Sequence, residues 1–347
     1  MVSHIYVHIP YCTNKCDYCD FYSEYPKQTV EDAYVKAVIS ELKERYGGEL
    51  VATVFFGGGT PSLLNGEQLK SILSKINLAK NHEVTIECNP ETITLEKLRD
   101  YKAVGVNRIS IGVQSFDDGK LRLIGRTRNI NVMDKIEQAI TVFDNVGIDL
   151  MYALPTQNNE DIVKEISYLL PEVKHVSYYA LTLEEGTRLF NKMEGEHPIN
   201  DDLQADLTEE VVRELAVQDF ERYEISNFAK DGYECQHNMA YWMYQDYLGI
   251  GAGAVSTIQG VRTENVKDIR TYTKGDRKGN EYKLTADEQA NEKLMMQLRT
   301  TKGMLFEERL SQYTEKYPDL LCVKDGRIIF TNKGFLVHDT IVSELML

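Results

Sequence analysis

Short β-branched, apolar runs alternate with helix-like stretches through the first half of the chain, and this alternation restricts the fold more than any other feature. The runs expected to be strands are residues 4–9, 53–56, 84–87, 108–111, 148–151 and 176–179. Between them apolar residues recur at helical spacing, for example Leu69, Ile72, Leu73 and Ile76. Repeated β-then-α units predict a parallel sheet wrapped by helices, and six units are too few for a closed eight-stranded barrel. We therefore predict an α/β fold based on an open, partial (β/α)6 barrel.

Chemically distinctive residues gather just after these runs rather than before them. Cys12 follows the first run, residues 57–61 (GGGTP) the second, residues 87–90 (ECNP) the third and residues 112–115 (GVQS) the fourth, and Asp149 lies in the fifth. In β/α barrels the carboxyl ends of the strands carry the active site. We therefore expect these segments to meet at one mouth of the barrel.

The pattern changes from about residue 200. The next helix is predicted by the spacing of Leu203, Leu207, Val211 and Leu215, and an aromatic- and glycine-rich segment follows it. Thr285 and Glu288 have the spacing of a capping box, which predicts a helix that runs to Leu298. We divide the chain into a barrel at 1–200, an extension of the barrel at 201–285, and a small C-terminal domain at 286–347.

Charge and hydrophobicity exclude several classes of function. The chain has 347 residues and a net charge of −15, with 54 acidic and 39 basic residues. Because such a surface repels phosphate backbones, nucleic acid is not expected as the main partner. The N-terminal segment lacks the pattern of a signal peptide, and no stretch approaches the roughly 18 to 20 apolar residues of a membrane helix. We expect a cytoplasmic protein without an integral membrane segment.

Three of the six cysteines lie close together in the spacing C-x3-C-x2-C, formed by Cys12, Cys16 and Cys19. In a reducing compartment such a group is more typical of metal ligands than of disulfides. Three thiolates on one loop can bind three irons of a [4Fe–4S] cluster and leave the fourth iron open to a chelating ligand such as S-adenosylmethionine. Structural zinc, with Cys88 or a nearby histidine as a fourth ligand, and three unrelated buried thiols are the alternatives.

The glycine-rich segment GGGTP at residues 57–61 favours the cluster over zinc. It lacks the Lys and Ser/Thr of a P-loop, and its glycine spacing is not that of a dinucleotide fold. A tight turn would explain one or two glycines, but it explains three glycines followed by Pro61 poorly. Adjacent glycines let a ligand approach the backbone closely, which suits the amino-acid moiety of S-adenosylmethionine.

With these motifs placed on strands, the sequence resembles the radical S-adenosylmethionine superfamily. More narrowly it resembles the oxygen-independent coproporphyrinogen III oxidase family and, within it, the HemW-like branch of haem chaperones. The resemblance covers essentially the whole chain and is carried by the segments YVHIPYCTNKCDYCDFYS, VFFGGGTPSLL, IECNPETI, RISIGVQSFDD, IGRTRN, DLMYALPTQ and YYALTLEEGT. It implies a radical S-adenosylmethionine barrel followed by a small C-terminal α/β domain of winged-helix type.

The resemblance also implies roles for individual residues. The implied cluster ligands are Cys12, Cys16 and Cys19, and the implied contacts of a first S-adenosylmethionine are Tyr6, Gly58, Gly59, Thr60 and Glu87. The positions that match a second S-adenosylmethionine in the oxidase relatives are Gln114, Arg126, Asp149 and, less closely, Ala180. Without the family, Glu87 and Asp149 could cap helices, and Arg126 could form a surface ion pair.

Two departures from the oxidase pattern point to the HemW-like branch. Phe21 stands where the oxidase pattern has a further cysteine. The oxidase also has an N-terminal extension ahead of its cluster, whereas Cys12 lies near the start of this sequence. Both departures count against decarboxylation of coproporphyrinogen.

The segment HNMAYW at residues 237–242 matches a pattern of HemW-like proteins that the resemblance links to haem. A neutral imidazole such as that of His237 can bind haem iron, and nearby aromatic rings can stack on a porphyrin. The alternative is a histidine whose hydrogen bonds are satisfied inside an aromatic core. Cys235 is a second candidate haem ligand, or a buried thiol.

The leading hypothesis is a HemW-like protein that binds haem, a [4Fe–4S] cluster and one or two S-adenosylmethionine molecules, and that delivers haem to acceptor proteins. A homodimer is one assembly it could form. The second hypothesis is an oxygen-independent coproporphyrinogen III oxidase, in which a 5′-deoxyadenosyl radical starts the oxidative decarboxylation to protoporphyrinogen IX. The third is a zinc-stabilised interaction module. The sequence leaves open whether the protein is an enzyme.

Overall fold

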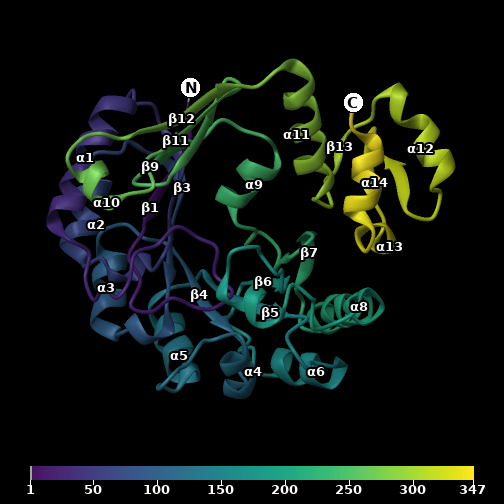
Figure 1. Cartoon of the computed structure of the whole chain (residues 1–347), viewed down its shortest axis with the longest axis horizontal. Coiled ribbons are helices and arrows are strands. Elements are labelled where there is room, and N and C mark those ends of the chain that lie inside the picture. Colours follow the sequence, from purple (N-terminus) through teal and green to yellow (C-terminus); the bar gives the residue numbers. More distant parts are fainter. Residues whose placement is uncertain (1) are drawn as a thin grey trace.

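Six parallel strands, which are neighbours in space in the same order as in the chain, form the centre of the computed structural model (Figure 1). The structure describes residues 2–347. The strands are β1 His4–Ile9, β2 Val51–Gly58, β3 Leu78–Cys88, β4 Arg108–Gln114, β5 Val146–Tyr152 and β6 His175–Ala180. Each pairs in parallel with the next, and the linear strand order leaves the sheet open. The prediction of an α/β fold with an open, partial barrel is confirmed.

Helices connect these strands and cover the outer face of the sheet. They are α1 Asp32–Arg45, α2 Gly66–Leu73, α3 Leu95–Ala103, α4 Asp118–Leu123, α5 Val132–Val142 and α6 Asn159–Ser167. Asn65 and Gln68 form a capping box at the start of α2, where each side chain accepts from the other's backbone N–H. Leu69, Ile72 and Leu73 are buried, as their spacing predicts. Among the helices of residues 2–347, none is both long enough and apolar enough to span a membrane.

The two faces of the parallel sheet carry opposite kinds of side chain, because successive strand residues point to opposite sides. The face toward the helices is aliphatic and buried, and includes Ile5, Val7, Val54, Val84, Ile86, Ile109, Ile111, Ile148 and Val176. The alternating positions, which face the barrel interior, are polar or aromatic: Tyr6, Thr53, Phe55, Glu83, Glu87, Arg108, Ser110, Asp149 and Ser177. Barrels are ordinarily filled by branched aliphatic side chains. This interior carries hydrogen-bonding groups instead.

Residues 201–283 extend the sheet at both edges. β8 Asn227–Ala229 pairs antiparallel with β6, β7 Glu221–Glu224 pairs with β8, and β9 Leu248–Ile250 pairs in parallel with β1. A second, antiparallel sheet consists of β10 Val255–Ile258, β11 Val261–Asn265 and β12 Lys278–Lys283. The helices of this part of the chain are α8 Asp201–Val217, α9 Gln236–Trp242 and α10 Ile269–Thr273, and the short α7 Arg188–Lys192 precedes them. In α8 the predicted apolar positions Leu207, Val211 and Leu215 are buried.

The C-terminal residues have a hydrophobic cluster of their own, and their yellow-green to yellow ribbon lies to one side of the barrel in Figure 1. The helices are α11 Ala286–Leu298, α12 Ser311–Lys316, α13 Asn332–Phe335 and α14 His338–Leu345. A small antiparallel sheet has the strand order β13 Met304–Leu305, β15 Arg327–Phe330 and β14 Leu321–Lys324. The predicted capping box between Thr285 and Glu288 is present at the start of α11.

Candidate cofactor and ligand site

The loop after β1 carries the three clustered cysteines and is held by its own backbone. Cys12 N donates to Glu24 O at 3.1 Å, and Lys27 N donates to Cys12 O at 2.8 Å. Cys19 N donates to Cys16 O at 3.3 Å, which closes a tight turn between these two cysteines. All three are free thiols, and burial raises the pKa of Cys16 and of Cys19. Metal binding must therefore displace their protons.

The glycines at the end of β2 allow this strand to lie against β1 and the cysteine loop. A β-carbon on Gly58 would lie 2.6 Å from the His8 ring, and one on Gly59 would lie 3.0 Å from Cys12 Sγ. Gly58 also has a φ of +115°, which L-residues with a side chain rarely adopt. The glycines are therefore needed for close packing against β1 and the cysteine loop, in addition to the close approach of a ligand that the sequence suggests.

A cavity of about 160 Å³, here called the strand-end cavity, lies where the cysteine loop meets the carboxyl ends of the strands. Cys12, Cys16 and Cys19 line it. Of the residues implied to contact S-adenosylmethionine, it is lined by Gly58, Gly59, Thr60, Glu87, Gln114, Arg126 and Asp149. Three free thiols beside an open backbone and buried polar side chains are a donor set that fits a [4Fe–4S] cluster and an amino-acid ligand.

Arg126 connects the cysteine loop to two strand ends. Its Nη2 donates to Asn89 Oδ1 and to Gly112 O, both at 2.7 Å, and its Nη1 donates to Tyr18 Oη at 3.4 Å. Only 8 % of the side chain is exposed, so the alternative of a surface ion pair is wrong. Burial raises the pKa of Cys16, and the positive charge of Arg126 opposes that rise.

Gln114, the last residue of β4, holds a strained backbone conformation at the same place. Its φ is +67°, in the left-handed region that a glutamine seldom adopts. Tyr179 donates a hydrogen bond to Gln114 Oε1 at 2.6 Å, which fixes the amide. Strain of this kind is concentrated at ligand-binding sites, where the surrounding structure maintains it.

Two buried carboxyl groups border the strand-end cavity. Gly58 N donates to Glu87 Oε2 at 3.3 Å, and Ser110 Oγ donates to the Asp149 carboxylate at 3.0 Å. Burial, and then the neighbouring Asp149, raise the pKa of Glu87 to about 8. Burial also raises the pKa of Asp149, against hydrogen bonds from Ser177 and Ser110. Neither residue is the N-cap of the helix that follows it, so the helix-cap alternative is wrong.

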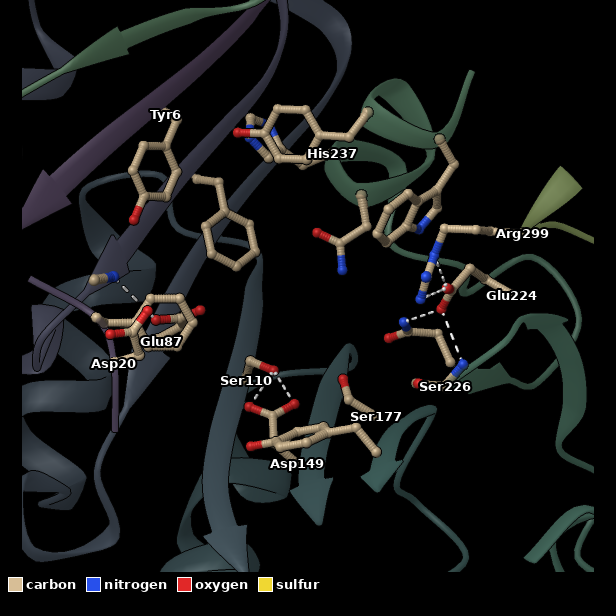
Figure 2. A pocket seen from close by; sticks show the side chains of 18 of the residues that line it. Tyr6, Asp20, Glu87, Ser110, Asp149, Ser177, Glu224, Ser226, His237 and Arg299 are labelled. Carbon is tan, nitrogen blue, oxygen red and sulfur yellow. Dashed lines mark hydrogen bonds and ion pairs between the residues drawn. The ribbon is translucent and has the colours of Figure 1, made fainter. Parts of the chain in front are cut away.

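A larger cavity of about 640 Å³, here called the barrel cavity, occupies the polar interior of the sheet (Figure 2). This volume is within the usual range of small-molecule sites. Gly58, Glu87, Asp149 and Tyr179 line both cavities, so the two adjoin. The aromatic residues of its wall are Tyr6, Tyr18, Phe21, Phe55, Tyr179, Tyr241 and Trp242. Figure 2 shows Tyr6 and Glu87 on one side of it, and Glu224 with Arg299 on the other.

Tyr6 and Ala180 lie outside the strand-end cavity. Tyr6 lines the barrel cavity, its Oη is hydrogen-bonded to His8 Nδ1 at 2.9 Å, and its ring stacks on Phe55. Ala180, at the end of β6, pairs with Tyr152 of β5 and packs against the core. Ala180 borders neither cavity, so the structure does not bring it to the other predicted contacts.

Both ring nitrogens of the buried His237 are hydrogen-bonded. Gln245 Oε1, which can only accept, lies 2.6 Å from His4 Nε2, so the neutral His4 ring accepts at Nδ1 from the Thr53 hydroxyl at 2.9 Å. Thr53 Oγ1 then accepts from His237 Nδ1 at 2.6 Å, and His237 Nε2 accepts from the Tyr241 hydroxyl at 2.9 Å. Burial lowers the pKa of His237 to about 3 and lowers that of His4, so both rings are neutral. His237 Nε2 can bind iron only after Tyr241 moves.

Cys235, the other candidate haem ligand, is fully buried and borders neither cavity. Its Sγ lies 3.6 Å from Glu83 Oε1, as a donor to that carboxylate. Burial raises the pKa of the Cys235 thiol to about 12. Because the thiolate is the form that binds metal, this geometry favours the buried thiol over the ligand.

The arrangement of ligating side chains does not favour zinc. Within residues 2–347, no three or more His, Cys, Asp or Glu side chains converge as ligands of one metal ion. Structural zinc needs four ligands around a single ion, whereas a [4Fe–4S] cluster takes each cysteine on a different iron. The zinc-stabilised interaction module therefore has no support in the described part of the chain.

Several residues of the barrel cavity are missing from the sequence-based site. They include Phe55, Arg108, Ser110, Ser177, Tyr179, Glu224, Asn227 and Arg299. Those on the strands alternate with aliphatic residues, as in Arg108-Ile109-Ser110-Ile111, so the period-2 pattern could have identified them as inward-facing. Glu224 and Arg299 lie 75 positions apart and have no such signal, because only the fold brings them together.

Comparison with known proteins assigns these features to a family. A model of the Radical SAM superfamily matches residues 6–169. The heme chaperone HemW of Lactococcus lactis is 34% identical over 99% of this chain and 97% of its own. The chain belongs to the HemW family. The Bacillus subtilis member is 35% identical, over 90% of this chain and 86% of its own, and the Escherichia coli member is 39% identical, over 72% and 68%.

The solved structure of the coproporphyrinogen III oxidase HemN from Escherichia coli has the same fold as this HemW-family chain. Its TM-score is 0.81, over 98% of this chain and 88% of that one, at 22% sequence identity. The family-model match and the HemW relatives confirm the predicted membership of the radical S-adenosylmethionine superfamily, and this structure shows the shared fold. Membership implies a [4Fe–4S] cluster and S-adenosylmethionine, and the strand-end cavity is lined by residues whose chemistry is suited to both.

Proposed function

We propose that this HemW-family protein binds haem and delivers it to acceptor proteins. The observation that carries the proposal is the similarity, over nearly the full length of both chains, to proteins named heme chaperone HemW. The barrel cavity supports it, because its wall offers aromatic rings to a planar ligand. The ligand would lie beside the strand-end cavity, where the cofactors fit.

Residues of the strand-end cavity hold the cofactors in this proposal. Cys12, Cys16 and Cys19 bind the [4Fe–4S] cluster, which supplies low-potential electron transfer when bound. The backbone of residues 58–60 approaches the first S-adenosylmethionine, and the protonated Glu87 can donate a hydrogen bond to it. The group formed by Gln114, Arg126 and Asp149 would contact a second S-adenosylmethionine from the opposite strand ends.

Oxidation of coproporphyrinogen III is the second candidate. The specific observation in its favour is that the two cavities adjoin, so a tetrapyrrole in the barrel cavity would lie next to the S-adenosylmethionine site. Both functions need the same cavities, so only product analysis separates them.

The deciding experiment incubates the anaerobically reconstituted protein with haem and, in parallel, with coproporphyrinogen III. We expect one haem per chain, seen as a Soret band that persists through gel filtration and passes to an apo-haemoprotein on mixing. We expect no consumption of coproporphyrinogen and no release of 5′-deoxyadenosine. Conversion to protoporphyrinogen IX would replace the chaperone with the oxidase, and loss of haem on gel filtration would refute haem binding.

Ligation of haem iron by His237 remains a prediction, and the hydrogen-bond chain gives it a sharp test. Replacement His237→Ala should remove the low-spin Soret and visible bands of bound haem. Replacement Tyr241→Phe removes the hydroxyl that occupies Nε2, so it should leave those bands intact and increase haem affinity. If His237→Ala leaves the haem spectrum unchanged, another residue binds the iron.

A further inference from the structure

Arg108, the first residue of β4, is a buried cation without a direct ion-pair partner. Its side chain is 1% exposed and lines the barrel cavity. Within residues 2–347, no carboxylate lies within 4.0 Å of the guanidinium, and Nε has no hydrogen-bond partner. A buried charge that has lost its hydration is unfavourable unless a partner replaces the water. The structure therefore presents half of an ion pair to an internal cavity.

The acidic residues nearest to Arg108 are already engaged. Glu83 accepts from the backbone N–H groups of Gln236 and His237, both at 3.1 Å. Glu87 accepts from the Gly58 backbone, and burial raises its pKa to about 8, so it is largely protonated at neutral pH. Asp149 accepts from Ser110. None of them supplies the direct ion pair that an interior arginine needs.

Two further unpartnered polar atoms belong to residues that line the same cavity. Trp242 Nε1 and Asn227 Oδ1 are buried without a hydrogen-bond partner, and both residues line the barrel cavity. Buried polar groups in native proteins are nearly always hydrogen-bonded, so each exception requires an explanation. Three exceptions around one aromatic-walled cavity have a common explanation in a ligand that carries polar groups on its edge.

We propose that Arg108 binds a carboxylate group of a porphyrin in the barrel cavity, which is a propionate in the case of haem. A guanidinium can hold a carboxylate through two parallel N–H···O hydrogen bonds, so the contact fixes orientation as well as charge. This inference rests on the proposed function and adds the residue that orients the ligand. The anchored edge of the macrocycle then lies inside the barrel.

The test compares two metal-free ligands, protoporphyrin IX and its dimethyl ester, by fluorescence titration in the same detergent buffer. Metal-free ligands remove any contribution of an iron ligand. The wild type should bind the free acid roughly 10- to 100-fold more tightly than the ester, the usual effect of a charge-assisted hydrogen bond. Arg108→Met should abolish this preference, and Arg108→Lys should retain part of it. Equal preference in wild type and Arg108→Met overturns the proposal.

Thermal unfolding without ligand distinguishes an anchor from a structural residue. Because no residue forms a direct ion pair with Arg108, and Glu83 and Asp149 act on it only through longer-range attraction, the melting temperature of Arg108→Met should stay close to that of the wild type. A lower melting temperature, with equal loss of affinity for both porphyrins, would show a structural role and overturn the proposal. Arg262→Met is the matched control, because Arg262 pairs with Glu292 through both terminal nitrogens at 2.8 Å outside the barrel cavity. This variant should keep the preference for the free acid.

Titration with S-adenosylmethionine separates the two carboxylates that could reach Arg108. The affinity of the reconstituted protein for S-adenosylmethionine should be the same in the wild type and in Arg108→Met. A tenfold loss in the variant would assign Arg108 to the carboxylate of S-adenosylmethionine and overturn the porphyrin contact. If wild-type protein binds neither porphyrin, the proposed function fails. If it binds both equally, only the inference on Arg108 fails.

Discussion

Two regions of the barrel are built from the same strands: the carboxyl ends of the strands, and a set of inward-facing residues that we call the floor. They differ in whether their polar groups are stabilised by hydrogen bonds within the protein. At the floor, formed by His4, Thr53, Glu83 and His237, hydrogen bonds join the side chains of His4, Thr53 and His237, and Glu83 accepts from the His237 backbone N–H. At the strand ends, Gln114 has a strained backbone, Glu87 keeps a proton that it would lose in water, and three thiols are free. Satisfied networks hold the fold, and unfavourable groups are retained where ligands bind.

Among the inward-facing side chains without a complete set of hydrogen bonds, which also include Thr85 and His175, Arg108 is the one that carries a charge. It lies on the same inward-facing side of β4 as Ser110, close to the satisfied floor, yet it has no direct ion-pair partner. Like the groups at the strand ends, it is in an unfavourable state as long as no ligand is bound. The binding region therefore extends down into the barrel, beyond the motifs that mark the strand ends.

The largest effect is expected for the cluster ligands. Replacing Cys12, Cys16 and Cys19 together with Ala should reduce reconstituted iron from about four per chain to none, because these thiols are the cluster's protein ligands. The melting temperature of the protein as isolated should stay close to that of the wild type, since none of the three thiols forms a disulfide and Cys16 and Cys19 are only half-buried. Iron analysis and absorbance measure the first effect, and calorimetry measures the second.

Cys88→Ala is the matched control for this experiment. Cys88 lies at the end of β3 and borders the same cavity, but burial raises the pKa of its thiol to about 12. This variant should keep its full iron content. Iron retained by the triple variant would refute the cluster assignment, and collapse of its fold would show that the strand ends are structural.

Motifs made the strand ends predictable from the sequence. Cys12, Gly58 and Gln114 follow predicted strands, Glu87 ends one and Asp149 lies within one, and parallel strands bring their carboxyl ends to one edge. This rule requires only the order and direction of the strands, so the sequence alone was enough to predict that these residues converge. Ala180 shows its limit, because its position at a strand end does not bring it into the cavity.

Glu83 tests the structural role of the floor and should show the next largest effect. Its carboxylate accepts from the backbone of Gln236 and His237 at the start of α9, and from Cys235 Sγ. Glu83→Ala should lower the free energy of unfolding by about 3 kcal/mol, because it leaves several buried donors unpaired. Urea denaturation at pH 7 measures the change.

The exposed Glu67 of α2 provides the control. Its side chain is 85% exposed, so Glu67→Ala should change the free energy of unfolding by less than about 0.5 kcal/mol. A Glu83→Ala variant as stable as Glu67→Ala would remove the contrast between floor and strand ends.

The floor itself could not be predicted, for a physical reason. His237 and Cys235 look like metal ligands in the sequence, because residue type shows which atoms can bind a metal but not which bonds they already make. Thr53, His4 and Tyr241, which saturate His237, come from distant segments. Only the packing of α9 into the barrel establishes those bonds.

Replacement of Glu87 should increase the free energy of unfolding, unlike replacement of Glu83, and the increase should depend on pH. Its pKa is 4.5 in the unfolded chain and about 8 in the fold, so the unfolded state loses its proton first as pH rises. This group therefore lowers stability progressively between pH 4.5 and 8. Glu87→Gln should unfold like the wild type at pH 4 and be more stable by about 2–4 kcal/mol at pH 8. Equal stabilities at pH 8 would show that Glu87 is ionised in the fold.

The smallest effect is expected at the wall that joins the barrel to the C-terminal residues. Arg299 binds the buried Glu224 through Nε at 2.9 Å and Nη2 at 2.7 Å, and its guanidinium lies 5.0 Å from the centre of the Trp242 ring (Figure 2). Glu224 keeps hydrogen bonds from Ser226 and Asn227, so Arg299→Ala should lower the free energy of unfolding by only about 1–2 kcal/mol.

A binding experiment shows whether this wall resembles the structural floor or the ligand-binding strand ends. If it is structural, Arg299→Ala should leave porphyrin affinity unchanged, because Arg299 already has its partner whereas Arg108 does not. Fluorescence titration with protoporphyrin IX measures this beside urea denaturation. A loss of affinity as large as that of Arg108→Met would mean that the ligand displaces Glu224 from Arg299. The wall would then be part of the binding region, because Arg299 would exchange Glu224 for the ligand when the cavity is occupied.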